Sequence, residues 1–500
     1  MIENGVYRRR QSAVAIALAL MAPVEISCTV GPDFARPEPP AASGYRSDPK
    51  DVDAEPVPDA LTQHIVIGQT FDSDWWMLFK CAALNVLVLQ AIEGNRTLDA
   101  TRATLARAQE LAAASEGARY PQLGVTAGTG RQKYGEQFLG SFATIPPFTY
   151  YSLGAVVSYT FDFSGGVRRS VEQQGALAES VRQELAAAYL TLTGAVVTQV
   201  LAIAAYREEI GAVERILAQD RENLQLVQTA YEAGSVARAD VVSAESQLAN
   251  DRTYLPPLRQ DLNTARHALA VLLGKPPGNY APPDFDLSQF TLPRELPVSL
   301  PSDLARRRPD ILAAEAQLHA ATAAVGVATA NLYPRITLSA TAGPQSTDLN
   351  QLFDSSKNAW SAIAALTAPV FDGGTLRAQR RAAIDAMRSR AATYQEVVLE
   401  AFGQVADRLD ALDHDAEQRA AQTRALEAAE SNLSFARAGF SVGNSGVLAV
   451  LDAERQSQQA RVGYARAESR QYQDTVLLIL ALGGNTPYSP DAPAQSPHAF

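Results

Sequence analysis

The sequence predicts a mainly α-helical protein with a small β part, in which a unit of two strands and a long helical hairpin occurs twice. The first observation is an internal repeat: YEAGSVARADVVSAESQ at 231–247 matches FSVGNSGVLAVLDAERQ at 440–456, with Gly234 aligned to Gly443. The second is that Ala, Leu, Val, Gln, Arg and Glu dominate long stretches, as they do in long packed helices. The third is that segments alternating between apolar and polar residues precede each long helical stretch.

Composition excludes several classes of function. The chain has 500 residues and a net charge of −11, and its basic runs are limited to Arg8–Arg10 and Arg306–Arg308, which argues against nucleic acid as a partner. Two cysteines, Cys28 and Cys81, are too few for a disulfide framework, so Cys81 is interpreted as a free structural thiol. His414 lies among aspartates, but we interpret this as a solvated helix face and expect no metal site. Because no enzyme motif occurs, we expect no catalytic residues.

The N-terminal segment predicts export from the cytoplasm. Residues 1–27 combine a basic start with an apolar stretch and a small residue before Cys28, which is typical of a signal peptide. A proline-rich arm over 28–70 follows. No later window of about 18 uninterrupted apolar residues occurs, so we expect no transmembrane helix. Any part that enters a membrane must then consist of β-strands.

The first predicted repeat covers residues 71–273. After Tyr120-Pro121 the periodicity changes from helix to strand, and FDFSGG at 161–166 ends the second alternating segment. The elements expected are, in order, helices over 84–94 and 98–119, strands over about 122–130 and 151–161, a long helix to about 232, and a second helix to about 273.

Seven-residue spacing predicts that the two long helices pack as an antiparallel hairpin. Asp251 interrupts the companion set of apolar positions, and Pro256-Pro257 should kink the second helix. The main set of apolar positions is Val241, Leu248, Leu255, Leu262 and Leu269.

The second predicted repeat covers residues 302–484, after a proline-rich connector over 274–301. Pro309 fits the first turn of a helix, and FDGG at 371–374 matches the earlier FDFSGG. Strands are expected over about 335–343 and 360–371, followed by a long helix, a turn at Gly443 and a last helix. The tail over 485–500 is expected to be disordered.

Four strands suggest that several copies of the chain assemble. A strand of ten residues is about 33 Å long, which suits the apolar band of an outer-membrane barrel when tilted. Four strands cannot close a barrel, and open edges cannot lie in lipid. Three copies would supply twelve strands, enough for an aqueous duct, with hairpins about 100 Å long extending from it.

Specific motifs resemble the TolC-like outer membrane factors, in the lipoprotein branch that serves resistance-nodulation-division (RND) efflux pumps. The matching segments are CTVGPDFARPEPP at 28–40, WWMLF at 75–79, RHALAVLLG at 266–274, LARRRPDILAAEAQL at 304–318, LYPRITLSATAG at 332–343 and FDGG at 371–374. The resemblance implies a homotrimeric exit duct with a twelve-stranded barrel and a periplasmic α-helical barrel. Its implied partners are a periplasmic adaptor (a membrane fusion protein), an inner-membrane RND transporter and outer membrane lipid.

The resemblance also implies roles for particular residues. Cys28 would carry N-terminal acyl chains and no other cofactor is expected, although Glu25 stands where the lipidation motif usually has leucine. Asp240 and Asp452 would line a periplasmic gate, with Gly234 and Gly443 as hinges of the hairpin tips. The alternative is that both aspartates only stabilise the first turns of their helices.

Two other functions remain open at this point. A duct of a type I protein secretion system would share the architecture, although the lipoprotein-like N-terminus favours the efflux branch. A purely structural coiled-coil protein of the envelope would explain the seven-residue spacing but not four alternating segments. The exported substrate cannot be predicted, because a wide duct contacts its cargo weakly.

Overall fold

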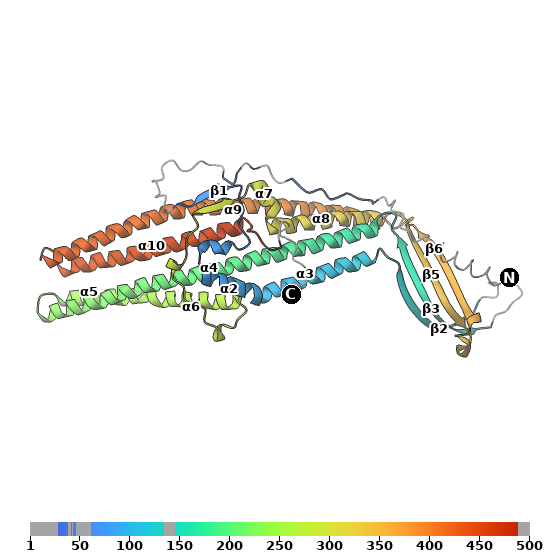
Figure 1. The fold of residues 1–500 in the computed structure, drawn as a ribbon, viewed down its shortest axis with the longest axis horizontal. Helices are drawn as coiled ribbons and strands as arrows, with labels where there is room; N and C mark the ends of the chain where they lie inside the picture. The colour runs from blue at the N-terminus through green and yellow to red at the C-terminus, as the bar shows by residue number, and fades with distance from the viewer. Residues whose placement is uncertain (1–28, 39–41, 43, 47–61, 135–145, 489–500) are drawn as a thin grey trace. The chain divides into compact units, whose positions relative to one another are not determined.

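The structure, a computed structural model, describes residues 29–38, 42, 44–46, 62–134 and 146–488. These residues form two compact units, and each sequence repeat contributes to both (Figure 1). Unit 1 takes residues up to 36, 107–178 and 316–392, and unit 2 takes 37–106, 179–315 and 393 onward. The units therefore separate the four-stranded sheet from the hairpin tips and do not coincide with the sequence repeats.

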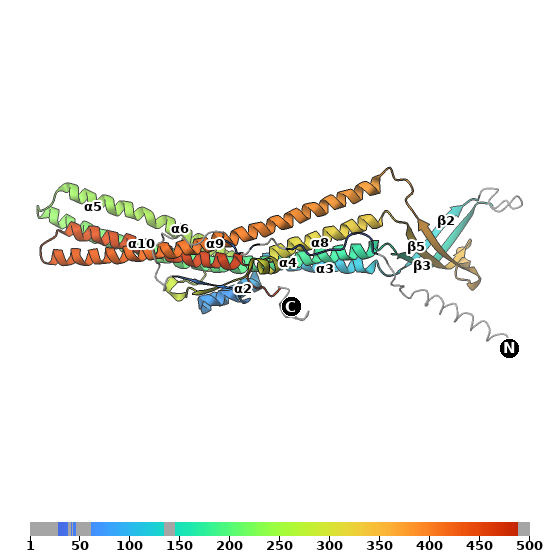
Figure 2. The same cartoon turned by 90° about the horizontal axis from the view of Figure 1, so that it is seen from above.

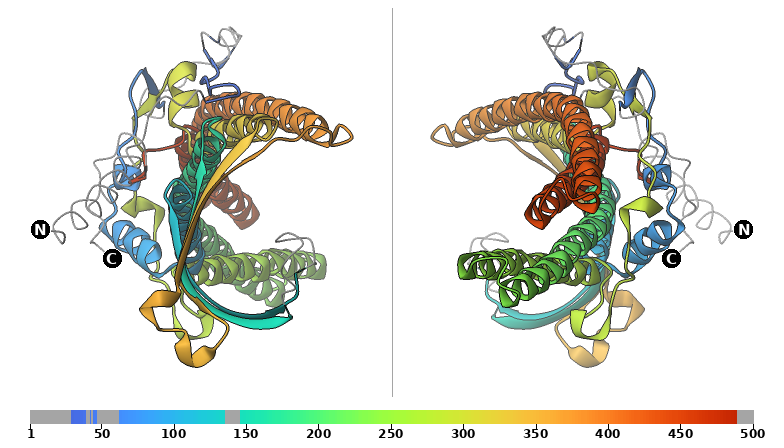
Figure 3. Two further views of the ribbon diagram at one scale, coloured as in Figure 1. Left: turned by 90° about the vertical axis from the view of Figure 1, so that its right-hand side faces the viewer. Right: turned by 90° about the vertical axis from the view of Figure 1, so that its left-hand side faces the viewer.

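Unit 1 contains an antiparallel sheet in the order β2-β3-β5-β6. Its strands are bent and twisted rather than flat (Figure 3), as strands of strongly curved sheets are. Strand β6 ends at residue 367, so Val370 and Phe371, which the sequence analysis placed in a strand, lie beyond it. The strand bounds are Gln122–Gln132 (β2), Phe148–Phe161 (β3), Arg335–Ser346 (β5) and Asn358–Thr367 (β6).

Four helices run through the boundary between the units, because both units take parts of each of them. They are α3 (Arg96–Gly117), α4 (Gly166–Glu232), α8 (Pro309–Ala330) and α9 (Thr375–Ser441). Helix α8 begins at Pro309, which confirms the expected first-turn proline, whose missing N–H costs nothing there.

Within unit 2, two helical hairpins are present, and Figures 1 and 2 both show α9 beside α10 and α4 beside α5 and α6. The predicted interruption at Pro256-Pro257 is confirmed, because one 3₁₀ turn (Arg252–Tyr254) separates α5 from α6 and the prolines occupy the first turn of α6. The bounds of the returning helices are Arg238–Asp251 (α5), Leu255–Leu272 (α6) and Val447–Ala481 (α10).

Seven-residue spacing correctly predicts four of the five main buried positions of the first hairpin, whereas the fifth, Leu255, is only partly buried. Val241 is 2% exposed, Leu248 6%, Leu262 8% and Leu269 0%. The main hydrophobic core of unit 2 includes Trp75, Trp76 and Phe79 of the WWMLF motif and buried residues of α2 (Ala82–Gly94). Trp75 and Phe79 are among the largest fully buried side chains, and each removes more apolar area from water than a smaller side chain would.

Regions rich in proline form more regular structure than the sequence analysis expected. Strand β1 (His64–Ile67), from the arm, pairs in parallel with β4 (Glu295–Val298), from the connector. Pro297 is tolerated in β4 because both strands of a two-stranded sheet are edge strands, where a residue without a backbone N–H can be accommodated. The connector also includes α7 (Pro301–Arg307). In the tail, Thr486 is buried and the Tyr488 ring packs on Tyr189, so disorder is wrong for residues 485–488.

Two helices have the length and mean hydropathy of a membrane span, although no uninterrupted apolar run of about 18 residues follows the N-terminal segment. Helices α4 and α8 each contain a stretch long and apolar enough to qualify. More than half of each stretch is buried within the protein, as in the core helices of soluble proteins. Alanine explains the high mean hydropathy of these two stretches, because many small apolar residues raise the mean without forming an uninterrupted run of large apolar residues.

Candidate functional site

The strand sheet of unit 1 has one apolar and one polar face. Residues that directly oppose each other on paired strands point to the same side. Leu123 opposes Val157, Leu338 opposes Tyr159, and Ile336 opposes Leu366. Most apolar residues of the four strands therefore share one face, whereas Val156 and Ile363 lie on the opposite face, across from Thr341 and Ser339. The opposite face carries small polar residues, which are Thr126, Ser152, Ser158, Thr337, Ser339, Thr341 and Ser361.

Both outer strands of this sheet expose apolar side chains. Val125 of β2 is 77% exposed, and Trp360 of β6 is 80% exposed. Within the described residues, β2 pairs with β3 alone and β6 with β5 alone, so each keeps one free hydrogen-bonding edge. Aromatic residues also flank the strands on the side of the helices, namely Tyr120, Phe161, Tyr333 and Phe371. This pattern matches the apolar band and aromatic girdle of strands that cross an outer membrane.

The two hairpin tips have the same backbone geometry. Gly234 and Gly443 both have φ of 76°, a conformation that favours glycine. In the first tip the Ser235 N–H donates to the Ala230 carbonyl at 2.9 Å, and in the second the Asn444 N–H donates to the Gly439 carbonyl at 2.8 Å. These are Schellman-type endings, in which glycine stops the helix and allows a tight reversal.

Asp240 and Asp452 do not occupy equivalent positions behind these turns. Asp240 is the third residue of α5, and its Oδ2 accepts a hydrogen bond from the Ala237 N–H at 2.9 Å. Asp452 is the sixth residue of α10, too far from the helix start to cap it. Its Oδ1 instead pairs with Arg455 at 2.8 Å, and its Oδ2 accepts from Gln456 at 2.8 Å. The capping interpretation therefore holds for Asp240 and is wrong for Asp452.

The start of the described chain is held on helices α4 and α8 in unit 1. The Val30 N–H donates to the Ser164 carbonyl at 3.1 Å, and the Arg169 guanidinium donates to Asp33 at 2.5 Å and to Glu172 at 2.7 Å. The Phe34 ring stacks on His319 with centroids 4.3 Å apart.

We call the contacts of Asp33 and Phe34 with Arg169, Glu172 and His319 the N-terminal clamp. Its charged side chains compensate one another. Sequence patterns did not predict it, because its partners lie more than 130 residues apart. Burial disfavours the charged form of Glu172, but hydrogen bonds from Arg169 and His319 outweigh it and hold its pKa below the usual range. Cys28, the expected lipidation site, lies outside the described residues, next to this clamp in sequence. Cys81 is a half-buried free thiol.

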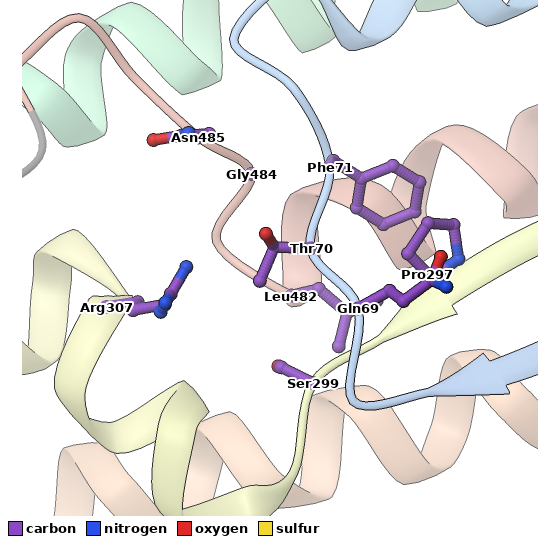
Figure 4. A pocket seen from close by; sticks show the side chains of 9 residues that line it. All are labelled: Gln69, Thr70, Phe71, Pro297, Ser299, Arg307, Leu482, Gly484 and Asn485. Carbon is purple, nitrogen blue, oxygen red and sulfur yellow. The ribbon is translucent and has the colours of Figure 1, made fainter. Parts of the chain in front are cut away.

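A small pocket in unit 2 lacks the groups that acid–base catalysis requires (Figure 4). It contains one ionisable side chain, Arg307, and the remaining lining residues are Gln69, Thr70, Phe71, Pro297, Ser299, Leu482, Gly484 and Asn485. Within the described part of the chain, no cluster of three His, Cys, Asp or Glu residues could hold a metal ion.

Known proteins resemble the chain over most of its length. The family model described as "Outer membrane efflux protein" matches residues 87–275 and 300–484. The pyoverdine export outer membrane protein OpmQ of Pseudomonas aeruginosa is 30% identical over 446 residues, which cover 88% of this chain and 93% of that protein. The solvent efflux pump outer membrane protein SrpC of Pseudomonas putida is 30% identical over 414 residues, covering 81% of this chain and 86% of that protein.

Solved structures show the same fold. The outer-membrane channel OprN has a TM-score of 0.81 and 30% identity, over 92% of this chain and 99% of that one. The outer membrane protein VceC from Vibrio cholerae has a TM-score of 0.75 and 26% identity, over 83% of this chain and 99% of that one.

A two-faced strand sheet, paired helical hairpins and these similarities define an outer membrane duct with the TolC-like fold. The chain belongs to the outer membrane efflux protein family. It is located in the outer membrane and extends into the periplasm, where it serves as the exit duct of a tripartite efflux pump. The similarities favour efflux over the type I secretion alternative.

Proposed function

We propose that three copies of the chain form one duct, in which their sheets close a twelve-stranded barrel and their hairpins form a periplasmic α-helical barrel. The observation that carries this proposal is the pair of free edges on β2 and β6, each with exposed apolar side chains. Unpaired backbone groups are costly in lipid, so these edges need partners from neighbouring copies. Three copies supply twelve strands, which leave room for water where eight would be filled by side chains.

The polar face of the sheet would line the lumen of this barrel. Several of its small hydroxyl groups have partners within the sheet: Thr341 and Ser361 lie 2.8 Å apart, and Thr126 and Ser152 donate to backbone carbonyls of the neighbouring strand. Such a lining has no groove that would hold one substrate tightly. The duct is therefore proposed to pass small molecules without chemistry of its own, and selection rests with the pump.

The partners proposed for the trimer are a periplasmic adaptor and an inner-membrane RND transporter. Support comes from the relatives, whose names assign them to pyoverdine export and to a solvent efflux pump. The hairpin tips are proposed as the closable periplasmic end, with Gly234 and Gly443 as hinges and Asp240 and Asp452 as gate residues. Identical φ angles at the two glycines support equivalent tips.

Cys28 is proposed to become the acylated N-terminus of the mature chain. Support comes from Val30, two residues after Cys28 in sequence, whose N–H is bonded to Ser164 between β3 and α4, and from the contacts of Asp33 and Phe34 with α4 and α8. Lipid at this point would add affinity of about 0.8 kcal/mol per buried CH₂ to a barrel already held in the membrane.

Native mass spectrometry of the protein released from outer membranes tests both proposals. We expect a complex of three chains, each beginning at Cys28 with added acyl mass. A monomer or dimer under conditions that preserve the fold would contradict the barrel. Chains that retain residues 1–27, or carry an unmodified Cys28, would contradict lipidation and leave the barrel untouched.

A further inference from the structure

Each helical hairpin buries one pair of aspartates between its helices. Burial and the neighbouring carboxyl of Asp251 on α5 raise the pKa of Asp220 on α4, and burial and the neighbouring carboxyl of Asp474 on α10 raise the pKa of Asp415 on α9. All four residues are at most 8% exposed. Two carboxyl groups in contact and away from water cannot both ionise readily, so such a pair tends to share one proton.

The second pair is compensated entirely within its own hairpin. Arg408 of α9 donates to Asp474 at 3.0 Å, and Arg470 of α10 lies 3.5 Å from Asp415. Burial and the Asp474 carboxyl raise the pKa of Asp415 to about 7, and Arg470 and His414 oppose this rise. Two guanidinium groups therefore face two carboxyl groups, and none of these contacts involves the first hairpin.

The first pair differs because its cation belongs to the other hairpin. The charged groups that act on Asp220 are Asp251 and Arg455 of α10. Arg455 already forms an ion pair with Asp452, the proposed gate residue, at 2.8 Å. Gln247 donates to Asp251 at 2.7 Å, while Oδ2 of Asp220 is buried and has no hydrogen-bond partner among the described residues.

Counting charges shows that this cluster, with all its carboxyl groups ionised, is two positive charges short of neutrality. Three carboxyl groups, those of Asp220, Asp251 and Asp452, share the single guanidinium of Arg455. Burial, together with the Asp251 carboxyl, raises the pKa of Asp220 to about 7. One of the two missing charges is therefore supplied by a shared proton near neutral pH, and this proton is lost to water in mild alkali.

We propose that the Asp220–Asp251 pair is a proton-linked switch for the charge of the gate. With the shared proton bound, Arg455 stays with Asp452 and neutralises it. When the proton leaves to water, the uncompensated carboxylate of Asp220 draws Arg455 toward α4, and Asp452 is left as an unpaired anion in the duct. A ring of unpaired carboxylates attracts cations, so the duct becomes cation-selective as pH rises.

This inference rests on the proposed duct with Asp452 at its periplasmic end, and ion selectivity tests it. Reversal potentials across planar bilayers in a KCl gradient give the cation-to-anion permeability ratio at pH values from 5.5 to 8.5. For the unmodified trimer we expect this ratio to rise at least twofold across the range. Asp220→Asn should hold it at the acidic value throughout, because a neutral amide never attracts Arg455.

A second variant keeps the test decisive if Asp220→Asn misfolds. Arg455→Gln, at a side chain 41% exposed, should hold the ratio at the alkaline value at every pH because Asp452 is never neutralised. Asp415→Asn is the matched control, and it should keep the rise of the unmodified protein. A rise that persists in Asp220→Asn, or a flat profile in the unmodified trimer, would overturn the switch. Absence of current from every assembled trimer would instead overturn the duct.

Discussion

Replacing Leu338 by arginine is expected to prevent assembly of the duct in the outer membrane. Leu338 is on the apolar face of the sheet, opposite Tyr159 on β3 and Ala364 on β6. Arginine on a lipid-facing strand costs about 2–4 kcal/mol near the middle of the bilayer, and a trimer incurs this cost three times. Electrophoresis of unheated outer membranes should show loss of the trimer band. Leu153→Arg, on the same face, should behave alike.

The neighbouring residue provides a matched control for this substitution. Ser339 follows Leu338 on β5, opposes Ser158 and Ile363, and points to the other face of the sheet. Ser339→Arg introduces the same charge and volume toward the proposed lumen, where water solvates it. We expect the trimer to assemble normally. Equal loss of trimer for both variants would show that the two faces are not lipid and lumen.

Removing both gate carboxylates is expected to raise single-channel conductance severalfold. If Asp240 and Asp452 lie in the narrowed tips, three copies of each surround the path, and their loss widens it and removes fixed charge. Asp240→Ala with Asp452→Ala should also increase sensitivity of cells to large antibiotics. Planar-bilayer recording of assembled trimers measures the effect directly.

Helix capping must be separated from gating in this experiment. Asp240 accepts the Ala237 N–H, so alanine there should also cost about 1 kcal/mol of helix stability. Asn at position 240 keeps an acceptor oxygen and removes the charge, so Asp240→Asn with Asp452→Asn isolates the electrostatic part. Unchanged conductance in a correctly assembled Asp240→Ala/Asp452→Ala trimer would reject the gate assignment.

Local sequence pattern was sufficient wherever neighbours along the chain decide the structure. Alternation located the strands, because side chains on a strand point to opposite faces with a period of two. Seven-residue spacing identified buried positions such as Leu248 and Leu262, and Pro256 marked the break in the returning helix. The same spacing identified Asp251 as a carboxyl at a core position. The structure shows that it is buried next to Asp220.

Long-range contacts could not be predicted in this way. Nothing near Arg169 in sequence indicates that it holds Asp33, and nothing near Arg308 indicates that it donates to the Ala481 carbonyl at 2.8 Å. Strands β1 and β4 were missed because four residues are too few to show alternation. Asp240 follows Gly234 by six residues and Asp452 follows Gly443 by nine, so equivalent turns place the two aspartates about one helical turn apart along their helices.

Cross-linking between the free strand edges tests the central claim most directly. Antiparallel pairing within the sheet means that β2 of one copy should meet β6 of the next in antiparallel fashion, with equal faces aligned. In a Cys81→Ser background, Thr126→Cys on β2 is combined with Ser361→Cys or a nearby cysteine on the same face of β6. The positive control is Ser158→Cys with Ser339→Cys, which oppose each other inside one chain.

Oxidation should then produce covalent trimers for at least one pair of edge positions, and an intrachain bond in the control. The closed ring predicts that the ladder of products stops at three chains. If the control pair oxidises while every edge pair stays monomeric, or if the ladder continues beyond three, the twelve-stranded barrel is contradicted.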